Sequence, residues 1–189
     1  MKIIILSIYL IAGPYGLSKD QAASVYAATR AVYASELGID LRLRRLRNKT
    51  DLFPGLYTLA SQYDHYYAWK AWLISKGRLP SKAKRIFYVM VPPMREGSIR
   101  YIGGLSEICH KSHLTSISLG SGEQYNQDGA YRMGHTSVIM QHEVGHQLCA
   151  THDDSLPATI MHSNALPYVP ALPQILHFSD KSKAEIRNY

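Results

Sequence analysis

The sequence predicts an α/β (α+β) fold: a twisted, mostly parallel β-sheet packed by helices and followed by an irregular C-terminal part that ends in a helix. Three observations indicate this class. Apolar segments typical of buried strands alternate with segments of helical period from Met1 to Val91. The 189 residues suit a single domain. The 46% of hydrophobic against 19% of charged residues supports a buried core and excludes a disordered or fibrous chain.

The apolar stretch from Met1 to Ala12 has two interpretations. A membrane span needs about 20 apolar residues, so this stretch is too short to be one. It matches either the apolar region of a signal peptide behind Lys2, which would imply secretion, or a buried first strand from Met1 to Tyr9. We favour the strand, because Ile3 to Ile5 are β-branched. The compartment of the protein therefore stays open.

A helix and a strand are predicted next. Ser18 begins a capping pattern, and apolar residues recur at helical spacing up to Leu37, where Gly38 acts as a stop. From Ile39 to Arg44, apolar and charged residues alternate with the two-residue period of a half-buried strand. The outer face of that strand is basic.

The remaining elements follow from the same signals of period, proline and glycine. Helices are predicted from Leu56 to Ser75, from Thr136 to Leu148 and from Ser179 to Tyr189. Strands are predicted from Ile86 to Val91, from Ser98 to Ile102 and from Thr115 to Leu119, with a turn at Gly103 and Gly104 and a polar loop from Gly120 to Gly134.

The formal net charge of +7 raises the alternative of a nucleic-acid-binding module. The basic strand face adds to this charge, and its cations are Arg42, Arg44, Arg45, Arg47 and Lys49. No recognition motif accompanies these residues. We therefore interpret them as a solvated strand face and expect no nucleic-acid partner.

The segment from His142 to Asp153 carries the clearest chemistry. His142 and His146 are four residues apart on a predicted helix, so both imidazoles lie on one face and can bind the same zinc ion. His152 completes a three-nitrogen set if the chain turns sharply near Cys149. Three protein ligands leave a fourth position open for water, which is the arrangement of a catalytic zinc site.

Glu143 lies beside this histidine face, where it can hold a zinc-activated water without binding the metal. We therefore predict a zinc-dependent metalloendopeptidase with one catalytic Zn²⁺, in which Glu143 is the general base. The expected partner is a protein or peptide substrate. We expect no membrane span in this chain.

The pattern HExxHxxxxxHD, followed by Thr159-Ile160-Met161, resembles the metzincin zinc metallopeptidases, which pair the histidine motif with a methionine-containing turn below the metal. Asp153 after the third histidine resembles the adamalysin (reprolysin-like) branch. Features similar to that branch are also found at Tyr101-Ile102-Gly103-Gly104, Cys109 and His177-Phe178-Ser179.

The resemblance implies one metallopeptidase catalytic domain over residues 1–189, with an N-terminal subdomain, 1–148, and a C-terminal subdomain, 149–189. It implies that an antiparallel strand forms the sheet edge and that Met161 forms an apolar floor beneath the histidines. We expect Asp153 to anchor the turn by hydrogen bonds. Substrate would lie extended along an edge strand near Ser98 to Leu105, with a pocket wall from His162 to Pro170. The chain resembles a bare catalytic domain without a pro-segment.

Cys149 departs from the family pattern, which has glycine at the end of the zinc-binding helix. A left-handed backbone costs a non-glycine residue about 1 to 2 kcal/mol, so the turn that carries His152 is in question. Cys149 has three candidate states: a thiolate metal ligand, a disulfide with Cys109, or a buried free thiol, which we favour. If Cys149 impairs the turn, the protein is a zinc-binding pseudopeptidase, the alternative to the active enzyme.

Overall fold

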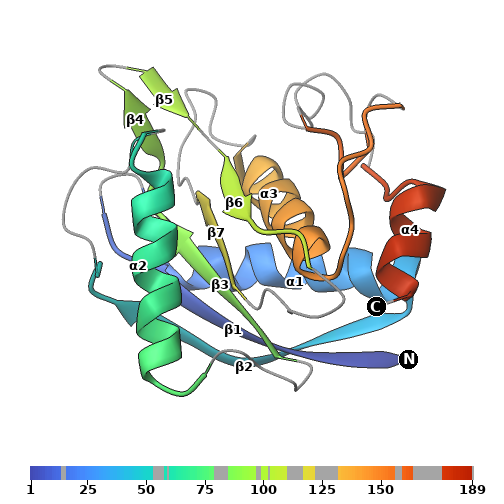
Figure 1. Cartoon of the computed structure of the whole chain (residues 1–189), viewed down its shortest axis with the longest axis horizontal. Coiled ribbons are helices and arrows are strands. Elements are labelled where there is room, and N and C mark those ends of the chain that lie inside the picture. Colours follow the sequence, from blue (N-terminus) through green and yellow to red (C-terminus); the bar gives the residue numbers. More distant parts are fainter. Residues whose placement is uncertain are drawn as a thin grey trace.

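A computed structural model describes the chain over residues 1–13, 16–52, 58, 60–78, 85–96, 99–101, 103–109, 117–121, 132–155, 159–163 and 176–188. Within these ranges, five strands form one sheet in the order β2-β1-β3-β7-β6 (Figure 1). Their bounds are β1 Lys2–Ile11, β2 Ile39–Lys49, β3 Arg85–Val91, β6 Gly104–Ser106 and β7 Ile117–Ser121.

Four of these strands are parallel, and β6 pairs antiparallel with β7 at the edge of the sheet. A separate antiparallel pair consists of β4, Met94–Glu96, and β5, Ile99–Tyr101. The predicted fold class is therefore confirmed, including its antiparallel edge strand.

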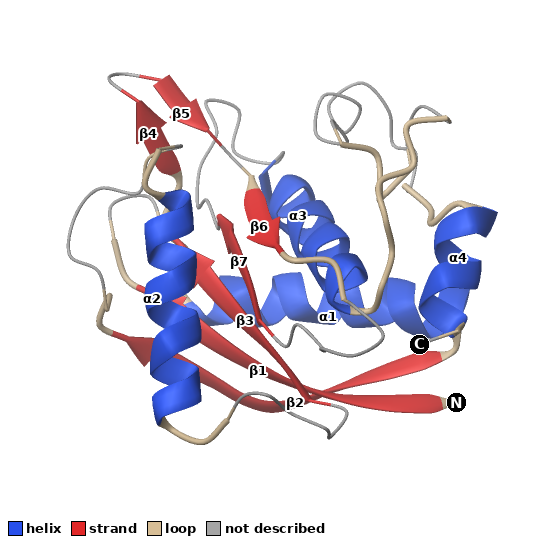
Figure 2. Ribbon diagram, viewed as in Figure 1, coloured by secondary structure: helices blue, strands red, loops and turns tan. Residues whose placement is uncertain are grey.

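The described residues include four helices, of which α1, α2 and α3 cover the two faces of this sheet, whereas α4 packs against α1 (Figure 2). They are α1 Lys19–Leu37, α2 Gln62–Ser75, α3 Arg132–Gln147 and α4 Asp180–Arg187. Helix α2 lies on one face, whereas α1 and α3 lie on the other. In the part of the chain that is described, no helix has both the length and the apolar character needed to cross a membrane.

The buried strands β1 and β3 send alternate side chains into two cores, as the pleat requires. Ile8 and Met90 pack into the core shared with α1, α3 and α4. Tyr9 and Val89, their neighbours in sequence, pack into the core under α2, where Tyr9 stacks on Trp69 with ring centroids 5.5 Å apart. Because β1 is buried on both faces, it reads as a continuous apolar run, and the predicted first strand is confirmed.

Helix α1 has the predicted caps at both ends. Ser18 accepts a hydrogen bond at 3.2 Å from the Gln21 backbone, and the Gln21 side chain accepts one at 2.8 Å from the Ser18 backbone, which forms a capping box. Gly38 ends the helix in the left-handed region, with φ 66°.

Two predicted boundaries are wrong, each for a local reason. Strand β2 continues to Lys49, because a bulge at Arg44 interrupts the alternation and hides the second half of the strand. Helix α2 begins at Gln62 instead of Leu56, because Thr58 and Ser61 exchange hydrogen bonds between hydroxyls and backbone in a turn before it. Residues 53–57 and 59 lie outside the described part.

The predicted glycine turn and polar loop are also corrected in part. Gly104 is the first residue of strand β6, so it belongs to the sheet edge. Helix α3 begins at Arg132 instead of Thr136 and so takes the end of the predicted loop, while Gly120 and Ser121 belong to β7. Residues 122–131 lie outside the described part. The final helix has its predicted N-cap, Ser179, whose side chain accepts a hydrogen bond from Ser182.

Candidate metal centre

Helix α3 carries the histidine motif and is fixed against the sheet and α1 by buried contacts. Val144 and Leu148 are fully buried in the main core. Tyr33 of α1 donates a hydrogen bond at 2.8 Å to the backbone carbonyl of Gln141. Gln147 donates one at 3.1 Å to the carbonyl of Phe87 in β3. The helix therefore has little freedom to slide, and the side chains on its other face are held in place.

The chain turns sharply at the end of α3, as the ligand spacing requires. The backbone N–H of Ala150 donates to the carbonyl of Gly145, and that of Cys149 donates to the carbonyl of His146, each at 3.0 Å. This pattern is a Schellman motif, and its left-handed position is occupied by Cys149 with φ 78°. Cys149 thus adopts the conformation usually taken by glycine, and His152 is not displaced from the other two histidines.

The Nε2 atoms of the three histidines converge on one point. They are 3.0 Å apart between His142 and His146, 3.2 Å between His142 and His152, and 3.2 Å between His146 and His152. A tetrahedral zinc ion with Zn–N bonds of about 2.0 to 2.1 Å requires nitrogen separations of about 3.3 Å. The three atoms therefore lie close to the spacing that a zinc ion needs.

Hydrogen bonds on the far side of two rings determine which nitrogen carries the proton. His142 Nδ1 lies 2.7 Å from the carbonyl oxygen of Ile160, and His146 Nδ1 lies 2.8 Å from that of Ala150. Because a carbonyl only accepts, both Nδ1 atoms are the protonated ones and both Nε2 atoms present lone pairs. Burial, together with the neighbouring His146, lowers the pKa of His142 to about 3. Burial also lowers the pKa of His146, to about 4. Two neutral nitrogens with facing lone pairs repel each other unless a cation lies between them, so the donor set fits a metal ion.

Glu143 lies beside this cluster on the side of strand β6. Its side chain is buried, and burial raises the pKa of the carboxyl group to about 8. Its Oε2 has no hydrogen-bond partner among the described residues. Since a buried polar oxygen without a partner is unfavourable, this atom is available to a group that enters the site.

Met161 and Asp153 lie next to the helix and the turn that carry the histidines. Met161 is fully buried, and its sulfur lies so close to α3 that a Cβ placed on Gly145, between the two helical histidines, would come within 2.5 Å of it. The backbone N–H of Asp153 donates to the Met161 carbonyl at 3.0 Å, and the Asp153 carboxylate accepts from Ser155. Hydrogen bonds from Ser155 and then Ser179 lower the pKa of Asp153, so it stays ionised as an acceptor.

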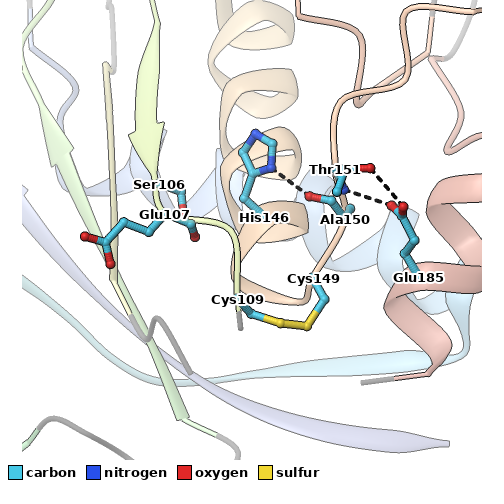
Figure 3. The surroundings of a disulfide bond; sticks show 8 residues. All are labelled: Ser106, Glu107, Cys109, His146, Cys149, Ala150, Thr151 and Glu185. Carbon is cyan, nitrogen blue, oxygen red and sulfur yellow. Dashed lines mark hydrogen bonds between the residues drawn. A yellow bond between two sulfur atoms is a disulfide. The ribbon is translucent and has the colours of Figure 1, made fainter. Parts of the chain in front are cut away.

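Cys149 is joined to Cys109 by a disulfide bond, so the favoured expectation of a free thiol is wrong (Figure 3). The Cα atoms of the two residues are 4.7 Å apart. The backbone N–H of Cys109 also donates to the carbonyl of His146 at 3.1 Å. The disulfide therefore ties the segment after β6 to the turn between the second and third histidines. The sequence left this pairing open because it does not reveal the distance between two cysteines 40 residues apart.

Helix α4 provides support that the sequence did not indicate. The Thr151 backbone N–H and hydroxyl both donate to the Glu185 carboxylate at 2.8 Å (Figure 3). Lys181 donates to the backbone carbonyl of His152 at 2.8 Å. Glu185 and Lys181 are four residues apart and face the same turn, but this spacing is common on exposed helices and does not single out a functional role.

The expected substrate-binding segments are described in part. Strand β6 lies at the sheet edge next to α3, within the region predicted to bind an extended substrate. Of the expected pocket wall, only His162 and Ser163 belong to the described part.

The basic residues of β2 are mostly exposed, and Arg42 pairs with Asp40 at 2.7 Å.

The three histidines of this cluster could hold a metal ion. No protein-family model and no curated protein matches the sequence. The structure is similar to the crystal structure of metalloproteinase-II from Bacteroides fragilis, with a TM-score of 0.62 and 12% sequence identity over 99% of this chain and 53% of that one. It is also similar to a structure of a chaperone-substrate complex, with a TM-score of 0.59 and 15% identity over 99% of this chain and 34% of that one. The chain thus spans about half the length of the first protein, and the likeness concerns the fold.

Proposed function

We propose that this protein is a zinc-dependent metalloendopeptidase of the metzincin type, with a single catalytic domain of two subdomains, 1–148 and 149–189. The observation that carries the proposal is the convergence of three histidine Nε2 atoms next to a buried carboxylate, one oxygen of which has no partner among the described residues. The fold similarity to a metalloproteinase supports it. The resemblance to the adamalysin branch rests on the sequence motifs alone.

His142, His146 and His152 would hold the zinc ion. When bound, zinc supplies a Lewis acid that polarises the scissile carbonyl and lowers the pKa of water at the open position. The hydrogen bonds from Nδ1 of His142 and His146 to backbone carbonyls keep both rings oriented. They also make the two Nε2 atoms stronger electron-pair donors to a metal ion.

Glu143 would act as the general base and then as the general acid. Its unpartnered Oε2 accepts a proton from water during attack on the carbonyl carbon and delivers it to the leaving amine nitrogen. Burial raises the pKa of this carboxyl, so its ionised form is a stronger base than an ordinary carboxylate. The extended substrate would pair with the edge strand β6 through main-chain hydrogen bonds.

The pseudopeptidase alternative depends on Cys149 disturbing the turn, and the described geometry does not favour it. The Schellman motif is complete, and the three Nε2 atoms are no more than 3.2 Å apart. For the nucleic-acid alternative, the described residues add nothing to the net charge of +7 and the basic strand face.

The test combines zinc content, measured by elemental analysis, with cleavage of casein in the presence and absence of a chelator. We expect about one zinc per chain and chelator-sensitive cleavage. The Glu143→Gln variant should keep its zinc and lose activity by about 10²- to 10⁴-fold, the usual contribution of a general base. Glu107→Gln is the matched control, because Glu107 pairs with Lys70 at 2.7 Å outside the histidine cluster. Absence of zinc from metal-replete protein, or full activity of Glu143→Gln, would refute the proposal.

A further inference from the structure

Strand β6 contacts the Glu143 side chain at a glycine. A Cβ placed on Gly104 would lie 2.5 Å from Glu143 Cγ, 2.6 Å from Oε1 and 2.7 Å from Cδ. Real Cβ atoms essentially never come within 3.0 Å of a heavy atom in a residue that is not their chain neighbour. The carboxylate of Glu143 therefore occupies the space that any side chain at position 104 would take.

The neighbouring residues of β6 show which face of the strand meets the metal helix. Leu105 packs against the core under α2, on the opposite side from Gly104, as alternation along a strand requires. Ser106 returns to the α3 side, where its hydroxyl lies 3.2 Å from that of Ser118. Ser118 in turn donates to the Glu143 backbone carbonyl at 3.0 Å. The edge strand and β7 thus fix both the backbone and the side chain of Glu143.

We propose that Gly104 is a positioning residue for Glu143: the missing side chain on the edge strand creates the space in which the carboxylate is held beside the three histidines. The catalytic consequence of this inference rests on the proposed function. The contact between Gly104 and Glu143 is independent of that function. Any side chain at position 104 would push the carboxylate away from its place or push β6 away from α3. A displacement of about 1 Å at a reacting group costs about 100-fold in rate.

The sequence motif Gly103-Gly104 has a different explanation under this proposal. Gly104 has no left-handed backbone in the structure, so its conformation does not demand glycine. The close approach of Glu143 demands it instead. The residue therefore serves the site rather than a turn.

A thermal double-mutant cycle tests the contact without relying on activity. In the protein with Glu143, the Gly104→Ala substitution should lower the unfolding midpoint by about 4 to 8 °C, the shift expected for one overpacked methyl group in a chain of this size. In the Glu143→Ala background, where Cγ and the carboxylate are gone, the same substitution should shift it by less than about 2 °C. Leu105→Ala is the matched control for damage to β6, and its shift should be equal in both backgrounds.

Activity provides the second readout. Gly104→Ala should retain about one zinc per chain while kcat for casein cleavage falls about 100-fold. Equal shifts from Gly104→Ala in both backgrounds, or an unchanged kcat, would overturn the positioning role. A wild-type protein that cleaves nothing would overturn the proposed function instead, and the thermal cycle would still decide whether Gly104 makes room for Glu143.

Discussion

Removing the disulfide between Cys109 and Cys149 should destabilise the metal-free protein by about 4 kcal/mol. The bond closes a loop of 40 residues, and the chain-entropy model of cross-linking assigns about this free energy to a loop of that length. For a domain of this size, the loss corresponds to a fall of about 8 to 16 °C in the unfolding midpoint. The zinc affinity should fall as well, because the bond ends in the turn that places His152.

Two double variants separate the cross-link from the backbone strain. Cys109→Ser with Cys149→Ser removes the bond and keeps a side chain at φ 78°. Cys109→Ser with Cys149→Gly removes the bond and also relieves the left-handed conformation. The glycine variant should be more stable than the serine variant by about 1 kcal/mol, which is the backbone relief less the extra entropy of an unfolded glycine.

Urea denaturation followed by circular dichroism in the presence of a chelator measures both differences without a contribution from bound metal. Competition with a chromophoric chelator then gives the zinc affinity of each variant. A serine variant within about 1 kcal/mol of the wild type would refute the loop-entropy argument. A glycine variant no more stable than the serine variant would refute the assignment of strain to Cys149.

Two further predictions concern Asp40 in β2 and Glu185 in α4. Asp40 is held ionised by hydrogen bonds, first from Arg42 and then from Arg30, which lower its pKa; its contribution to stability should therefore be complete above pH about 5 and vanish as the pH falls through the lowered value. Asp40→Asn should accordingly be less stable than wild type in urea at pH 7, with a gap that narrows as the pH falls below the ordinary Asp pKa of about 3.9. A gap that stays constant with pH would contradict this. Glu185→Ala should remove both hydrogen bonds to Thr151 and weaken zinc binding, whereas Glu185→Gln, which keeps one acceptor, should weaken it less; equal affinities by chelator competition would exclude a role for α4 in the site.

The sequence predicted those parts of the fold and site that depend on local pattern. β1 and α1 were recognisable because an unbroken apolar run and a capping box are properties of adjacent residues. The convergence of His142, His146 and His152 followed from helical spacing and one turn. These features need no knowledge of distant contacts.

The missed features depend on contacts between residues far apart in the chain. The cysteine pairing could not be chosen because it is decided by a distance in space. The pair Gly103-Gly104 predicts a turn, because glycine pairs usually mark turns, whereas the place of Gly104 is decided by its contact with Glu143 of α3. The second half of β2 was missed because a bulge at Arg44 reverses the alternation that reveals a strand.

The three histidines belong to one short stretch of chain, and this locality has a consequence for folding. His142 and His152 are only ten residues apart, whereas bringing Gly104 against Glu143 closes a loop of about four times that length, at an additional entropic cost of about 1 kcal/mol. The contacts among the three histidines thus have a short sequence separation. They can form while the edge strand has not yet docked. The three histidines need only this short stretch of chain, whereas the space for the carboxylate is complete only when β6 lies against α3.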